Sequence, residues 1–91
     1  MTHTLTKDEL KQAILTIIYN LGYCYLGKID IVETFSNNKH LGYILKLGLN
    51  VEDKPFTIAC EGNINTFLKF VEEELRKSSL HSISYFKGIQ I

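Results

Sequence analysis

A strict alternation of side-chain types runs along residues 41–49, Leu-Gly-Tyr-Ile-Leu-Lys-Leu-Gly-Leu. Every odd position carries a large apolar side chain, whereas the even positions carry glycine, isoleucine or lysine. Side chains of a β-strand point alternately to the two faces of its sheet, so the pattern predicts a strand with one strongly apolar face. Such a face has to be buried against another element. The chain must therefore fold around a sheet that is covered on one side.

A first helix with a single apolar stripe is predicted close to the N-terminus. Thr6 and Glu9 have the spacing of a capping box, with Thr6 as the N-cap. Leu5 and Leu10 then occupy the two positions of a hydrophobic staple. Gly22 ends the helix, because glycine readily adopts the left-handed conformation that follows a helix C-terminus. The stripe consists of Leu10, Ala13, Ile14, Ile17, Ile18 and Leu21.

A second helix is predicted between Gly62-Asn63 and Ser78-Ser79, with Asn63 or Asn65 as its N-cap. Its apolar stripe consists of Ile64, Phe67, Leu68, Val71 and Leu75. Its outer face carries the oppositely charged i, i+4 pairs Lys69–Glu73, Glu72–Arg76 and Glu73–Lys77. Like the first helix, it has one apolar face to bury.

Three more segments show strand patterns. The alternation begins again after Tyr23 and is clearest at residues 28–31, residues 56–60 form a short apolar run, and a last strand is expected from Ser82 towards Ile91. Turn residues at 36–39 and 51–55 separate the first three strands, which predicts an antiparallel meander. The expected fold is a single α+β domain over residues 1–91, with residues 1–5 frayed. It is a two-layer sandwich of order α-β-β-β-α-β, with both helices on one face of a four-stranded, mainly antiparallel sheet.

The alternation assigns each strand residue to one of two faces. The face under the helices is expected to hold Ile29, Ile31, Phe35, Leu41, Tyr43, Leu45, Leu47, Leu49, Phe56, Ile58, Cys60, Ile83, Tyr85, Ile89 and Ile91. The opposite, open face is mostly polar but includes four apolar residues. Together with one lysine they form the candidate partner surface, Val32, Ile44, Lys46, Ala59 and Phe86. The alternative interpretation is that these are scattered exposed apolar residues, which are normal on protein surfaces.

Charge and cysteine content restrict the function classes. Ten basic and ten acidic residues give a net charge of zero, and Arg76 is the only arginine, which argues against binding nucleic acid through its phosphates. No run approaches the about 20 apolar residues of a membrane span, and Met1–Thr4 lacks the pattern of a signal peptide. Cys24 and Cys60 lie in apolar strand-like runs, so we expect buried free thiols in a cytoplasmic protein.

Catalytic and cofactor motifs are missing from the chain. His3, His40 and His81 have no metal-ligand spacing, and no C-x-x-C pair or phosphate-binding glycine loop occurs. Cys60 is the best candidate nucleophile, but Phe56 and Ile58 share its face and predict that it points to the core. We therefore expect no cofactor, no metal and no catalytic residue.

The predicted function is a non-enzymatic protein-interaction module, such as a small regulator, adaptor or inhibitor. Its partner would be another protein or a second copy of itself, bound through the open sheet face or an edge strand. One alternative is nucleic-acid binding, because double-stranded-RNA-binding domains share the α-β-β-β-α order, although residues 63–66 lack the basic cluster that would support it. A small enzyme without a recognisable motif is the other alternative.

Overall fold

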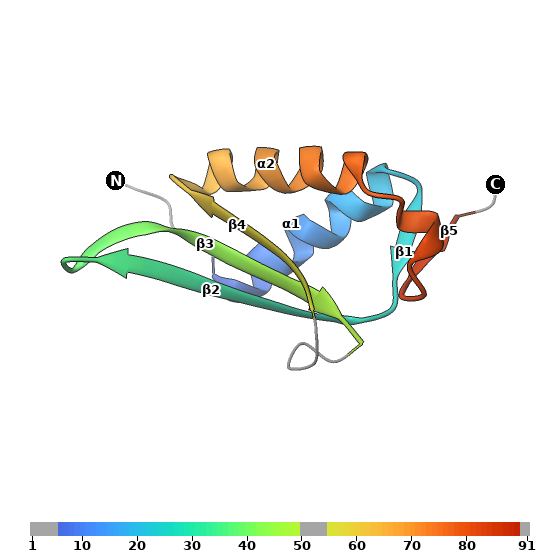
Figure 1. The fold of residues 1–91 in the computed structure, drawn as a ribbon, viewed down its shortest axis with the longest axis horizontal. Coiled ribbons are helices and arrows are strands. Elements are labelled where there is room, and N and C mark those ends of the chain that lie inside the picture. Colours follow the sequence, from blue (N-terminus) through green and yellow to red (C-terminus); the bar gives the residue numbers. More distant parts are fainter. Residues whose placement is uncertain (1–5, 50–54, 90–91) are drawn as a thin grey trace.

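A computed structural model describes residues 6–49 and 55–89 of the chain, and Figure 1 shows their arrangement. Its elements are α1 (Lys7–Asn20), β1 (Tyr23–Tyr25), β2 (Lys28–Ser36), β3 (Lys39–Gly48), β4 (Phe56–Glu61), α2 (Ile64–Lys77), the short 3₁₀ helix η1 (Leu80–Ser82) and β5 (Phe86–Gly88). The fold is α+β with antiparallel strands, as predicted, but the strands form two sheets, β2-β3-β4 and β1-β5. The prediction of one four-stranded sheet is therefore wrong.

The first helix begins and ends as predicted. The backbone N–H of Glu9 donates to Thr6 Oγ1 at 3.2 Å, and the N–H of Thr6 donates to Glu9 Oε1 at 3.0 Å, which completes the capping box. Gly22 follows the helix with φ +95°, a conformation that glycine adopts without steric cost. The residues of the stripe that are fully buried are Leu10, Ile14 and Ile18. The staple involves Leu5, which lies outside the described residues, as do residues 1–5 as a whole.

The second helix is capped by Asn63, whose Oδ1 accepts the N–H of Thr66 at 2.9 Å. Its buried residues are Phe67, Val71 and Leu75, as the apolar stripe predicts. Of the three predicted ion pairs, Glu72–Arg76 is formed, with 3.1 Å between Oε1 and Nη2. The other two are not formed between these described residues. The helix therefore owes its place mainly to its apolar face.

The three-stranded sheet is an antiparallel meander. Asn37 and Asn38 have φ of 52° and 66°, and Ser36 pairs with Lys39, so the hairpin closes through a two-residue turn of type I′. The register shifts near Thr34, because Leu41 has no partner across the strand pair. The predicted turn at residues 51–55 lies largely outside the described residues, although β3 and β4 pair antiparallel as expected.

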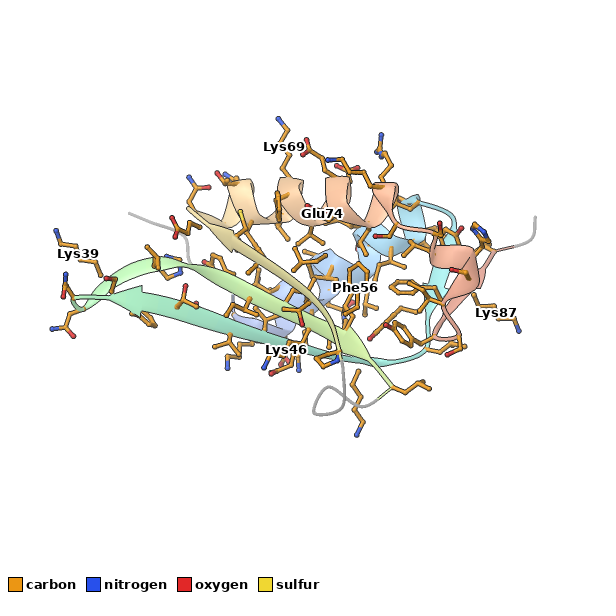
Figure 2. The ribbon with its side chains drawn as sticks, viewed as in Figure 1. Lys39, Lys46, Phe56, Lys69, Glu74 and Lys87 are labelled. Carbon is orange, nitrogen blue, oxygen red and sulfur yellow. The ribbon has the colours of Figure 1, made fainter. Side chains whose placement is uncertain are left out.

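One hydrophobic core joins both helices to one face of this sheet. Its strand members include Ile31, Tyr43, Leu45, Leu47 and Ile58, all from the face predicted to be covered. Side chains fill the space between α1, α2 and the sheet in Figure 2. Phe35 and Leu41, however, are 61% and 39% exposed. Both lie near the tip of the β2–β3 hairpin, beyond the end of β4 at Glu61, and the tip projects away from β1 and β5 (Figure 1).

The last strand differs most from its prediction. Ser82 belongs to η1, where its hydroxyl donates to the carbonyl oxygen of Ser79 at 2.7 Å, and the strand begins only at Phe86. Serine side chains often bond to nearby backbone in this way, which competes with strand pairing. β5 then pairs with β1, with Tyr25 opposite Phe86. The alternation predicted from Ser82 therefore does not apply to this segment.

Tyr25 connects the two sheets. Its hydroxyl donates to the carbonyl oxygen of Lys28 and accepts the N–H of Gly48 at 2.7 Å. Lys28 and Gly48 are opposite each other at the end of the β2–β3 pair, so the hydroxyl stands where a direct backbone hydrogen bond would otherwise form. Burial raises the pKa of Tyr25 to about 12. A side chain of β1 thus closes the end of the three-stranded sheet.

Candidate partner surface on the open sheet face

The open face has an apolar row at its centre. Val32 of β2 is opposite Ile44 of β3, and Ile44 is opposite Ala59 of β4. Neighbouring residues across antiparallel strands have side chains in contact distance on the same face. Val32 is 38% exposed, Ala59 is exposed and Ile44 is half-buried, so the row is accessible to a partner. Three of the five residues predicted for the partner surface are thus brought together.

Lys46 lies in the next row of the same face, between Asp30 of β2 and Thr57 of β4. Figure 2 shows its side chain on the side of the sheet away from α2. The row on the other side of the apolar row consists of Thr34, Gly42 and Glu61. The apolar centre is therefore flanked by one row containing a lysine and one containing a glutamate.

Phe86, the fifth predicted residue, is not part of this surface. It is 4% exposed and belongs to the core. Its ring contacts the rings of Tyr23 and Tyr25, with centroids 6.4 and 5.2 Å away. The prediction is wrong because β5 pairs with β1 and is not a fourth strand of the β2-β3-β4 sheet.

A shallow hollow of about 320 Å³ lies between residues of β2, β3 and β4, near the Glu61 end of the β3–β4 pair. It is lined by Thr34, Leu41, Tyr43, Ile44, Ala59, Cys60 and Glu61. Gly42 is buried and does not line the hollow, because a Cβ there would come within 2.6 Å of the Cα of Glu61 and still closer to the carbonyl oxygen of Cys60. The close approach of β4 therefore requires glycine at this position.

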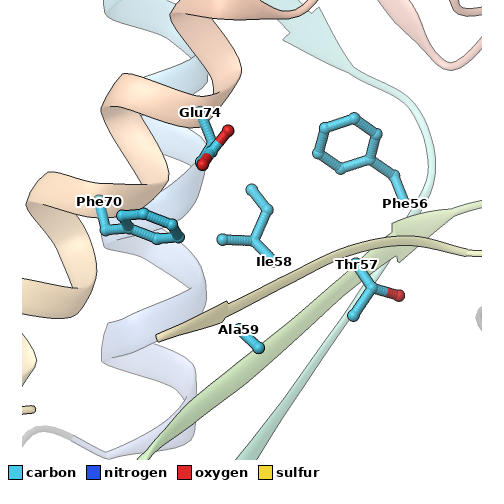
Figure 3. A pocket seen from close by; sticks show the side chains of 6 residues that line it. All are labelled: Phe56, Thr57, Ile58, Ala59, Phe70 and Glu74. Carbon is cyan, nitrogen blue, oxygen red and sulfur yellow. The ribbon is translucent and has the colours of Figure 1, made fainter. Parts of the chain in front are cut away.

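A groove of about 270 Å³ lies on the other side of β4, between this strand and α2 (Figure 3). It is lined by Phe56, Thr57, Ile58, Ala59, Phe70 and Glu74. In Figure 3 the side chain of Ile58 points into the groove towards Phe70 and Glu74, whereas those of Thr57 and Ala59 point away. Nothing in the sequence points to this groove, because periodicity predicts the faces of elements but not which elements become neighbours.

The reactive side chains are dispersed. Among the described residues, no group of three or more histidines, cysteines, aspartates and glutamates could hold a metal ion. Cys60 is half-buried and its Sγ donates to the carbonyl oxygen of Glu61, whereas Cys24 is exposed, contrary to prediction. The ring of His40 packs between those of Phe35 and Tyr43, with centroids 5.6 and 4.8 Å away.

Neither α1 nor α2 has the length and apolar character that a membrane-crossing helix needs, and the described residues include no other α-helix. Comparisons with protein-family models, curated proteins and solved structures gave no significant match to this chain.

Proposed function

We propose that the protein is a non-enzymatic interaction module that forms a homodimer through the open face of its three-stranded sheet. The observation that carries this proposal is the arrangement of Val32, Ile44 and Ala59 in one row between two polar rows. An apolar centre with a polar rim is the usual composition of a protein–protein interface. Zero net charge also leaves little general repulsion between copies.

A two-fold axis along the apolar row would make this face complementary to itself. Sheets that pack face to face are about 10 Å apart and keep their strands roughly aligned. The axis would place the apolar row on its own copy and the row of Lys46 over the row of Gly42 and Glu61. The stem of Lys46 would lie along the hollow that Ile44, Ala59 and Glu61 help to line, and its ammonium group would reach Glu61 of the other copy. Such an interface is isologous, with each pair away from the axis occurring twice.

The setting that we propose is the cytoplasm. The structure holds Cys24 and Cys60 as free thiols, and Cys24 is exposed. An exposed thiol persists most readily in a reducing compartment.

The dimer is tested by replacing the central residue of the row. Ile44→Glu places two like charges on the axis, and we expect the dimer dissociation constant to rise at least about tenfold, equivalent to about 1.4 kcal/mol. Sedimentation equilibrium measures it, and circular dichroism verifies the fold. Leu26→Glu is the control, because it introduces the same charge at an exposed apolar residue that lies outside the open face. An unchanged mass for Ile44→Glu, or a monomeric wild-type protein, would contradict the proposal.

The predicted orientation is tested by exchanging charges. Lys46→Glu and Glu61→Lys should each weaken the dimer, because each places like charges together across the axis. The double variant should recover most of the lost affinity, since it restores an attractive pair in the reversed sense. Added salt should weaken dimerisation of the wild-type protein and of the double variant, where opposite charges face each other, but should not weaken dimerisation of either single variant. If the two losses simply add, the dimer has another orientation.

A further inference from the structure

β4 presents an unpaired backbone edge beside α2. β4 is a terminal strand of the described sheet, with β3 as its one neighbour. The N–H of Gly62 donates to the carbonyl oxygen of Leu41 at 2.9 Å, so Gly62 points its backbone groups towards β3. Antiparallel pairing alternates along the strand, and Thr57, Ala59 and Glu61 consequently point theirs away from β3. These outward groups can receive another strand.

This edge lacks the protection that edge strands usually have. Charged side chains along an edge discourage pairing with another chain. The other edge strand, β2, carries Lys28, Asp30 and Glu33 along its length. In contrast, β4 reads Phe-Thr-Ile-Ala-Cys-Glu and has one charge, at its last residue. The edge next to α2 is therefore the one suited to strand addition.

The groove next to this edge has a defined chemistry. Its walls are Phe56 of β4 and Phe70 of α2, both partly buried and packed against the core, and Ile58 of β4, which belongs to the core. Glu74 of α2 is half-buried at the same groove, and its carboxylate is in no ion pair among the described residues. A half-buried carboxylate beside apolar walls favours a cationic partner. The groove thus combines an apolar site with a site for a positive charge.

We propose that the groove binds an extended segment of another protein, which adds to β4 as an antiparallel strand and carries a bulky apolar residue two positions before a lysine or arginine. Added strands hold their partner through backbone hydrogen bonds, and alternate side chains supply the specificity. The residue opposite Ile58 would face α2 and pack on Phe70. The residue opposite Phe56, on the same face, would reach Glu74. Because the added strand runs antiparallel to β4, its residue opposite Ile58 comes two positions before its residue opposite Phe56. The apolar residue therefore precedes the basic one.

The probes are short threonine-rich peptides that differ only in a central stretch of three residues. One carries Leu-Thr-Lys, a second carries Leu-Thr-Glu, and a third carries the same residues as the first in reversed order, Lys-Thr-Leu. We expect binding in the order Leu-Thr-Lys, then Lys-Thr-Leu, then Leu-Thr-Glu, with amide shifts in ¹H–¹⁵N spectra concentrated on β4 and the facing side of α2. Antiparallel pairing is the more stable arrangement, which accounts for the first preference.

Three variants distinguish the contribution of backbone hydrogen bonds to peptide binding from the contribution of the charge on Glu74. Thr57→Pro removes an outward N–H, which an edge strand tolerates, and should abolish binding of all three peptides. Glu74→Gln should weaken the Leu-Thr-Lys peptide about fivefold, and Glu74→Lys should reverse the preference in favour of Leu-Thr-Glu. Glu73→Gln is the matched control, because Glu73 is the exposed neighbour on the outer face of α2. It should leave all three affinities unchanged.

Several outcomes would overturn the proposal. They are the absence of binding to the wild-type protein, binding without charge preference, binding that survives Thr57→Pro, and shifts confined to the open face. If the protein self-associates, and Thr57→Pro abolishes this association whereas Ile44→Glu does not, a second copy of the chain occupies the edge of β4. Thermal unfolding of each variant verifies that it folds. Ile44→Glu changes the open face but not Glu74 or the outward backbone groups of β4, so the homodimer can fail while the peptide site remains. Glu74→Gln lies outside the open face, so the charge preference of the peptide site can fail while the homodimer remains.

Discussion

The hydroxyl of Tyr25 contributes to stability through two backbone groups on different strands. Tyr25→Phe would leave the N–H of Gly48 and the carbonyl of Lys28 without this partner. Loss of a partner from partly buried groups costs about 1–3 kcal/mol, and we expect the free energy of unfolding to fall by about 1–2 kcal/mol. Urea denaturation measures it. Tyr19→Phe, at an exposed tyrosine of α1, should change stability by less than about 0.5 kcal/mol. Equal effects of the two variants would contradict the role of Tyr25.

The same residue predicts how stability depends on pH. Burial is the main cause that raises the pKa of Tyr25 from 10.0 to about 12. Between these values the unfolded chain has lost the tyrosine proton and the folded protein retains it, so rising pH favours unfolding. The stabilisation is complete below pH 10 and is lost as pH rises towards 12. Burial also raises the pKa of Tyr43 and Tyr85.

Urea midpoints measured across this alkaline range test the assignment. In Tyr25→Phe the decline with pH should be shallower than in the wild-type protein. A residual decline from Tyr43 and Tyr85 should remain, in the same direction. A slope equal to that of the wild-type protein would show that Tyr25 does not titrate as described.

Two strand glycines should respond differently to the same small substitution. A Cβ at Gly42 would meet backbone atoms of β4, whereas a Cβ at Gly88 would meet nothing within 4 Å. Backbone cannot move aside as a flexible side chain can, so Gly42→Ala should cost about 1–3 kcal/mol. Gly88→Ala should be neutral within about 0.5 kcal/mol. Urea denaturation of both variants provides the comparison, and equal stabilities would contradict the close approach of β3 and β4.

At the scale of the element, the β2–β3 hairpin depends on its turn. Asn38 has φ 66°, which asparagine tolerates, glycine adopts freely and alanine disfavours. We expect Asn38→Gly to stabilise the protein by up to about 1 kcal/mol and Asn38→Ala to destabilise it by about 1 kcal/mol. Thermal denaturation checks both signs. If the two variants shift stability in the same direction, the turn is not of type I′.

At the scale of the whole molecule, Phe86 joins the small sheet to the main core. Its ring is buried beside Tyr23 and Tyr25, within the same cluster as the helix residues. Phe86→Ala should lower the free energy of unfolding by about 3–5 kcal/mol. Val32→Ala, on the open face, should cost less than about 1 kcal/mol. Denaturant titration followed by both far-UV circular dichroism and tyrosine fluorescence measures the loss, and a small effect at Phe86 would mean that the two sheets are independent.

The parts of the fold that local chemistry determines could be predicted from the sequence. The capping box of Thr6 and Glu9, the cap at Asn63 and the turn at Asn37 and Asn38 all use hydrogen bonds or dihedral preferences within four residues. Two-residue alternation likewise predicted that Tyr43, Leu45 and Leu47 of β3 are covered, although not that Leu41 is exposed. On the opposite, open face, the row of Val32, Ile44 and Ala59 follows once neighbouring strands pair in the register that one buried face demands.

The partners of β1 and β5 were decided by tertiary structure. No periodicity in residues 82–91 distinguishes a fourth strand of the main sheet from a separate strand that packs Phe86 against Tyr25. The groove between β4 and α2 also depends on which elements become neighbours. The sequence by itself thus determined the capped helices, the antiparallel meander and the one-sided sheet. Only the tertiary structure divided the strands into two sheets and buried Phe86, because long-range packing of a large ring outweighs the weak local preferences of the serines before it.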